Sequence, residues 1–125
     1  MPPEKVSAIV ESIVKTPLPP DVSNVYGRIV SVFTTNVGVR FSCSKETLDL
    51  FLTNSEVLSN NLEKGKRTML NSMGNTSWWK PDELKDVSGF EEEWILSSGK
   101  AYGLLMAGKS LNNENLTVYL SVTIE

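Results

Sequence analysis

Two adjacent tryptophans and a later tyrosine are the residues of this sequence best suited to contact a ligand. Trp78 and Trp79 follow a polar stretch, and Tyr102 lies in a later apolar segment. Neighbouring residues of an extended chain point to opposite sides, so both indoles cannot enter the same core. An exposed tryptophan near a tyrosine can stack on a sugar ring or anchor a protein partner. We therefore take Trp78, Trp79 and Tyr102 as candidate ligand-binding residues; the alternative is that one indole caps the core and the other lies beneath a loop.

A run of acidic residues follows the tryptophans. Residues 80–93 include six acids and two lysines, a local net charge of −4. So many carboxylates could bind Ca²⁺, although the spacing of an EF-hand loop is missing. Two of them could also serve as the acid and base of a glycoside hydrolase. A solvated edge that discourages aggregation is the simpler interpretation. The acids are Asp82, Glu83, Asp86, Glu91, Glu92 and Glu93.

The composition removes much of the usual catalytic and metal-binding chemistry. The chain of 125 residues has no histidine and one cysteine. Without imidazole there is no Ser-His-Asp or Cys-His nucleophile, and no zinc or iron site that uses histidine. A single cysteine forms no internal disulfide. Cys43 lies on the apolar side of an alternating segment, which predicts an inert core thiol. We expect no catalytic residues, no metal and no cofactor.

The balance of charge argues against a nucleic-acid partner. The formal net charge is −3, from 12 basic and 15 acidic side chains, whereas nucleic-acid binders usually carry a basic stripe. The basic residues Lys64, Lys66 and Arg67 are interpreted as part of a solvated loop. No apolar run approaches the roughly 18 residues of a membrane span. The first residues lack a signal pattern, which fits either a cytoplasmic protein or an exported one whose leader was trimmed.

The periodicity of apolar residues predicts the elements that must position these side chains. Residues 1–16 predict an N-terminal amphipathic helix, because apolar residues recur at helical spacing and Pro17 ends the segment. Residues 25–33 are β-branched and aromatic, and residues 37–43 alternate between apolar and polar. Together these two segments predict an antiparallel hairpin.

A second helix and a long connection are expected after the hairpin. Ser44 is suited to cap the helix, and a shorter helical piece is expected to follow it. The chain is polar from residue 63 to 77, which predicts a long loop with one helical turn at residues 69–73. The apolar face of the second helix consists of Leu48, Phe51 and Leu52.

Three further strands complete a single domain over residues 1–125. They are expected at residues 92–96, 101–107 and 116–124, and the second is apolar enough to lie centrally. The order α-β-β-α-β-β-β predicts an α+β fold, an antiparallel sheet of about five strands with two or three helices on one face. The helices are expected to cover the face made by Val39, Phe41, Leu120 and Val122.

Five short motifs also occur in a fixed order along residues 18–122. They are a proline-rich entry at 18–24, Val39-Arg40-Phe41, Leu50-Phe51-Leu52, Trp78-Trp79-Lys80-Pro81 and Val118-Tyr119-Leu120. In this order they resemble a group of small uncharacterised bacterial domains that are often exported or lipid-anchored. The resemblance implies an exported location; the group brings no activity and no site residues.

Together these features predict a non-enzymatic binding or interaction module of the bacterial envelope that uses an aromatic surface. A protein, peptide or glycan partner is expected. Two alternatives stay open. One is an immunity or inhibitor-type partner protein with an extended complementary surface. The other is a small carboxylate-dependent enzyme, in which one concave pocket would receive two carboxylates from among Asp82, Glu91, Glu92 and Glu93.

Overall fold

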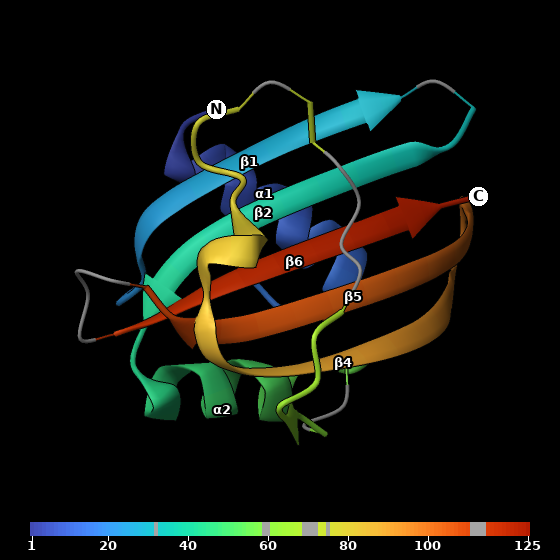
Figure 1. Ribbon diagram of the computed structural model, residues 1–125. Helices are drawn as coiled ribbons and strands as arrows, with labels where there is room; N and C mark the ends of the chain where they lie inside the picture. The colour runs from blue at the N-terminus through green and yellow to red at the C-terminus, as the bar shows by residue number, and fades with distance from the viewer. Residues whose placement is uncertain (32, 59–60, 69–72, 75, 111–114) are drawn as a thin grey trace.

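One antiparallel sheet and two α-helices account for most of the chain (Figure 1). The computed structural model describes residues 1–31, 33–58, 61–68, 73–74, 76–110 and 115–125. Neither helix of this described part is long and apolar enough to cross a lipid bilayer. In chain order the elements are α1 (Pro3–Val14), β1 (Ser23–Ser31), β2 (Thr35–Cys43), α2 (Lys45–Asn54), β3 (Glu63–Lys64), the 3-10 helix η1 (Pro81–Glu83), β4 (Lys85–Leu96), β5 (Gly99–Lys109) and β6 (Leu116–Ile124).

The six strands found in the described ranges follow the order β1-β2-β6-β5-β4-β3, and every neighbouring pair is antiparallel. The last strand of the chain, β6, lies between β2 and β5. It therefore joins the N-terminal hairpin to the C-terminal one. The apolar strand β5 lies between β6 and β4, as its composition predicts, and the α+β class is confirmed.

Helix α1 begins and ends where its prolines require. Pro3 occupies the first turn, where its missing N–H leaves no helical bond unmade. Lys15 adopts a left-handed conformation, with φ of 65°, and donates its N–H to the Glu11 carbonyl at 3.0 Å. Pro17 follows and prevents further helix. The buried stripe consists of Val6, Val10, Ile13 and Val14.

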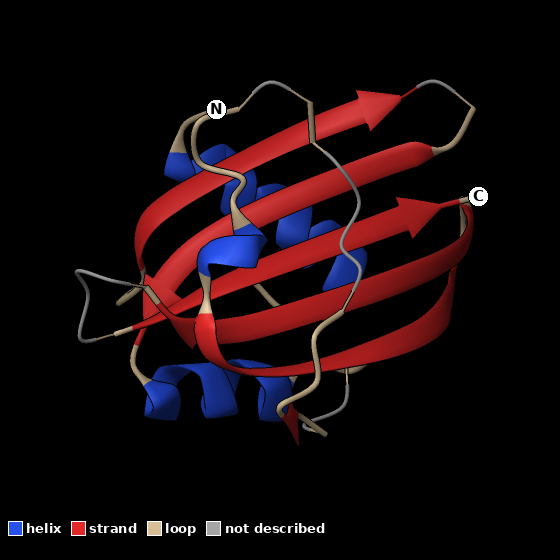
Figure 2. Cartoon of the chain, in the orientation of Figure 1, coloured by secondary structure: helices blue, strands red, loops and turns tan. Residues whose placement is uncertain are grey.

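Helix α1 crosses the sheet from one edge towards the other, behind the strands in Figure 2. Val6, in its first turn, lies against β1, where a Cβ atom on Gly27 would come 2.9 Å from it. Ile13, in its last turn, accepts a 3.0 Å hydrogen bond from the indole of Trp94 on β4. Glycine at position 27 is therefore required by the close approach of the helix.

Helix α2 starts at the predicted cap. The Ser44 hydroxyl accepts the N–H of Thr47 at 3.2 Å. The Thr47 hydroxyl in turn donates to the Asp21 carboxylate at 2.6 Å, which ties the proline-rich connector to the helix. Phe51 packs edge-on against Phe41 of β2, with ring centroids 6.0 Å apart. Helix α2 therefore covers the same face of the sheet as α1.

The two faces of the sheet are covered by different parts of the chain. The helix face carries Val39, Phe41, Leu120 and Val122, packed with the apolar residues of α1 and α2 as predicted. The opposite face, here called the loop face, is crossed by the segment that contains η1 (Figure 2). A smaller core lies beneath this segment, and it consists of Leu84, Val87, Met106 and Tyr119, with Trp79 against it.

The prediction of about five strands was one too low for the described residues. Glu63 and Lys64 form an additional two-residue edge strand opposite Gly89 and Ser88. Two residues carry no readable alternation, so sequence patterning does not find such a strand. The strand expected from residue 92 begins earlier, at Lys85. Its start was not predicted, because a bulge at Asp86 (φ 51°) interrupts the alternation of apolar and polar residues.

The short helical piece expected after α2 is absent from the described residues 55–58 and 61–62, which are bends and irregular chain. The Ser55 hydroxyl accepts the N–H groups of Val57 and Leu58, so a local turn replaces a second helix. The helical turn expected at residues 69–73 lies outside the described residues, apart from Met73.

Candidate functional site

Three side chains form a row across the loop face. Tyr26 of β1 lies opposite Arg40 of β2, and Arg40 lies opposite Tyr119 of β6. Side chains alternate along a strand, so burial of Val39 and Phe41 beneath the helices turns Arg40 to the loop face. Residues from the N-terminal hairpin and from the last strand of the chain therefore meet at one place.

The two predicted tryptophans lie on this row. The Trp78 indole stacks on the Tyr26 ring, with centroids 5.6 Å apart and an interplanar angle of 16°. Trp79 packs edge-on against Tyr119, at 5.1 Å and 88°. The two indoles contact each other at 5.7 Å and 89°. Both tryptophans are half-buried. We call Tyr26, Arg40, Trp78, Trp79 and Tyr119 the aromatic–arginine face.

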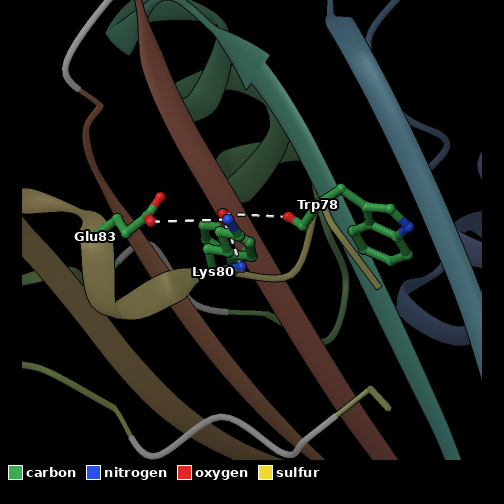
Figure 3. A network of polar contacts seen from close by, with 4 residues as sticks. Trp78, Lys80 and Glu83 are labelled. Atoms are coloured by element: carbon green, nitrogen blue, oxygen red, sulfur yellow. Dashed lines mark hydrogen bonds and ion pairs between the residues drawn. The ribbon is translucent and has the colours of Figure 1, made fainter. Parts of the chain in front are cut away.

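The Tyr119 hydroxyl holds the backbone that carries the tryptophans. It donates to the Trp78 carbonyl oxygen and accepts the N–H of Lys80, each at 3.3 Å. Burial raises the pKa of the Tyr119 phenol above its ordinary value, so the hydroxyl keeps the proton that it donates. The Lys80 ammonium lies 4.0 Å from the Glu83 carboxylate, and Figure 3 shows the Trp78 indole extending away from this ion pair.

Arg40 is a half-buried cation to which the described chain offers no acidic partner. Its Cζ atom lies 5.6 Å from the centroid of the Tyr26 ring, a cation–π arrangement. Its Nε atom is buried and has no hydrogen-bond partner. None of the ion pairs among the described residues includes Arg40. Removing an unpaired charge from water is unfavourable, so an anion bound beside Arg40 would be stabilised there.

The third predicted residue, Tyr102, lies apart from the tryptophans. It is on β5, opposite Thr123, whereas Tyr119 is four residues earlier on β6. Four residues of strand span roughly 13 Å. The Tyr102 ring instead contacts the Lys100 ammonium, 5.1 Å from its centroid. The structure therefore brings Trp78 and Trp79 together and leaves Tyr102 outside the aromatic–arginine face.

The sequence patterns did not identify Tyr26, Arg40 and Tyr119 as candidate site residues. A signal for two of them exists, because Arg40 and Tyr119 fall on the polar side of alternating strands. That signal places each residue on a face of its own strand. It does not tell that β2 pairs with β6, and this pairing is what makes the two residues neighbours.

The acidic residues are divided between two places in the fold. Asp82 and Glu83 lie in η1, while the three consecutive glutamates lie on β4 and alternate between the two faces. A hollow of about 280 Å³ is lined by Glu91, Glu92 and Glu93, without Asp82. The Glu93 carboxylate lies 3.2 Å from the Lys100 ammonium. Among the described residues, no three acidic or cysteine side chains are grouped closely enough to hold a metal ion.

Cys43 lies in the core, as its position on β2 predicts. Its side chain is 2% exposed. Burial, with a smaller contribution from the negative charge of Asp21, raises the pKa of the thiol to about 11. The thiolate is the nucleophilic form of cysteine, so this residue is unreactive at neutral pH.

Two larger hollows lie on the helix side of the molecule. One, of about 480 Å³, opens between α2 and β3 and is bordered by the Lys45–Asp49 ion pair. The other, of about 500 Å³, lies between the connector at residues 17–20 and α2, beside the exposed Leu50. Neither includes a residue of the aromatic–arginine face.

Comparison with known proteins adds no relative to these observations. No family model, no curated protein and no solved structure matches the chain. The resemblance to small exported bacterial domains therefore stays a prediction.

Proposed function

We propose that the protein is a non-enzymatic binding module whose aromatic–arginine face recognises a carboxylate-bearing segment of another protein. The observation that carries this proposal is the environment of Arg40. Its guanidinium lies against the Tyr26 ring, and its buried Nε atom has no hydrogen-bond partner. Arginine binds carboxylates through two parallel charge-assisted hydrogen bonds, so an acidic side chain is the ligand that fits it best.

The composition of the face supports a protein partner. Tryptophan, tyrosine and arginine are the residues that most often dominate the energy of protein interfaces. Tyr26 is 41% exposed, and the Trp78 indole stacked on it is half-buried. The exposed parts of the two rings therefore offer apolar surface next to a cation.

The face is also organised before binding. Trp78 is fixed by the Tyr119 hydroxyl on one side and by the Tyr26 ring on the other. A surface whose side chains are already ordered loses less conformational entropy when a partner binds. The family resemblance leads us to expect that this binding module acts in the bacterial envelope.

Titration with two acidic polymers tests the proposal. The probes are a short oligoglutamate peptide and an oligogalacturonate of similar charge, followed by NMR at the Trp78 indole and Arg40 Nε resonances. We expect oligoglutamate to shift both resonances. Arg40→Gln should weaken binding about tenfold or more, because a charge-assisted hydrogen bond contributes roughly 1.5–3 kcal/mol. Trp78→Ala should weaken it as well.

Lys45→Gln is the matched control, because it removes the same charge from an exposed position on α2. Binding should be unchanged in this variant. Equal losses in Arg40→Gln and Lys45→Gln would reduce the effect to net charge and contradict the proposed site. If the protein binds oligogalacturonate but does not bind oligoglutamate, the result would contradict a protein partner and favour a glycan.

A further inference from the structure

The two edges of the sheet differ in how they are protected against strand addition. At one edge, β3 covers Ser88 and Gly89 of β4, and three consecutive glutamates follow along the uncovered part of that strand. A short cover strand and a row of charges are the usual means of preventing edge-to-edge association. The β4 edge is therefore guarded.

The β1 edge has much less protection. Along its nine residues Arg28 is the single charged side chain. Within the described part of the chain, the β1 backbone is hydrogen-bonded to β2 and to no other segment. Ile29 is 45% exposed, and Phe33, two residues beyond the strand, is fully exposed. A bulge between Ser23 and Tyr26 distorts only the start of the strand, so regular edge remains from Tyr26 onward.

We propose that β1 pairs antiparallel with β1 of a second copy of the chain, about a twofold axis at Gly27. A twofold axis requires the same surface to be complementary to itself. Two residues that lie opposite each other in an antiparallel pair point to the same face of the sheet. The twofold axis must therefore pass at a residue of the strand, because an axis between two residues would oppose side chains from different faces. An axis at Arg28 would place like charges directly opposite each other.

The register centred on Gly27 is self-complementary on both faces. On the loop face it places Arg28 opposite Tyr26 of the second copy, a cation beside an aromatic ring, and the symmetry repeats this pair. On the helix face it places Val25 opposite the exposed Ile29 of the second copy. No side chain lies on the axis, because position 27 is glycine where α1 approaches β1.

This pairing goes beyond the proposed binding function, because it needs no acidic ligand. It would place the two aromatic–arginine faces side by side on one continuous sheet, each extended by Arg28 of the other copy. Dimerisation and binding of oligoglutamate are measured separately, so either proposal can fail while the other stands.

Sedimentation equilibrium of the full chain tests the dimer. We expect the wild type to be dimeric and Ile29→Lys to be monomeric, because the substitution puts a charge opposite Val25 of the second copy. Ile95→Lys is the matched control: Ile95 is 75% exposed on β4, at the guarded edge, so this variant should stay dimeric. Arg28→Glu, at an exposed position, should also weaken the dimer at least tenfold and covers the case in which Ile29→Lys unfolds.

Disulfide trapping tests the register. The variant Val25→Cys with Ile29→Cys should form an interchain disulfide on mild oxidation, and neither single substitution should. The native Cys43 does not interfere, because it is buried and its pKa is about 11. A monomeric wild type, or a dimer that survives both Ile29→Lys and Arg28→Glu, would overturn the proposal. A dimer that the double variant does not trap would overturn the register at Gly27.

Discussion

The hydroxyl of Tyr119, on the last strand, lies 3.3 Å from the carbonyl oxygen of Trp78, 41 residues earlier in the chain. The same hydroxyl accepts the N–H of Lys80, so one phenol fixes the backbone on both sides of Trp79. The ring of Tyr119 belongs to the small core on the loop face. The two tryptophans of the aromatic–arginine face are therefore anchored to the sheet by the buried side chain of Tyr119 rather than by their own half-buried rings.

Tyr119→Phe should loosen the aromatic–arginine face while leaving the fold intact. The variant removes one donor and one acceptor and leaves the Trp78 carbonyl and the Lys80 N–H without their partner. We expect the free energy of unfolding to fall by about 1 kcal/mol. Quenching of tryptophan fluorescence by acrylamide should increase. Urea unfolding and quenching measure the two effects.

Tyr102→Phe serves as the control for this variant, because its ring contacts the Lys100 ammonium at the far end of β5. It should leave tryptophan quenching unchanged. Equal quenching of the wild type and Tyr119→Phe would show that the hydroxyl does not hold Trp78 in place.

Local patterns were enough to predict most of the secondary structure. The cap at Ser44 and the alternation over residues 116–124 depend on neighbours in the chain, and both are found where expected. Strand β3 was not predicted because its two residues form a strand only by pairing with β4. The start of β4 was not predicted because a bulge interrupts its periodicity. Such elements exist only once the rest of the sheet has formed.

The candidate site was predictable only in part, because only some of its residues are marked by local features of the sequence. The sequence singles out Trp78 and Trp79 by their adjacency, which is a local property. Tyr26 becomes a neighbour of Trp78, and Arg40 a neighbour of Tyr26, only through the strand order and the path of the chain across the loop face. Tyr102 has the right residue type, but its register on β5 places it elsewhere.

Trp94→Phe should detach the end of α1 from β4. The indole donates to the Ile13 carbonyl at 3.0 Å, and its ring lies where a Cβ atom on Gly103 would come within 2.6 Å. Loss of the bond and of ring volume should lower the free energy of unfolding by about 2 kcal/mol. Trp78→Phe, at a half-buried position, should lower it by less. Urea unfolding compares the two variants, and the reverse order would contradict the assignment of Trp94 to the core and Trp78 to the surface.

Stability should decline at alkaline pH partly because of Cys43. Its pKa in the folded protein is about 11, raised by burial from an ordinary value of 9.0. Between these values the unfolded chain loses a thiol proton that the folded chain retains, so the free energy of unfolding falls as the pH rises. The slope from this group reaches at most about 1.4 kcal/mol per pH unit. Cys43→Ala should show a shallower decline from pH 9 to 11 in urea unfolding, and parallel curves would contradict the assignment.

Arg40→Met should leave the free energy of unfolding unchanged or raise it by up to about 1 kcal/mol, because methionine fills similar space without an unpaired, half-buried charge. Arg67 provides the contrast. Its guanidinium donates to the Leu84 carbonyl, so Arg67→Met removes a hydrogen bond and should lower stability by about 1 kcal/mol. Urea unfolding of the two variants at the same pH and salt concentration compares them directly. An arginine that does not stabilise the fold at a half-buried position would support the proposed role of Arg40 in binding a partner. A loss in Arg40→Met as large as that in Arg67→Met would assign Arg40 to the fold and remove the main support for the binding face.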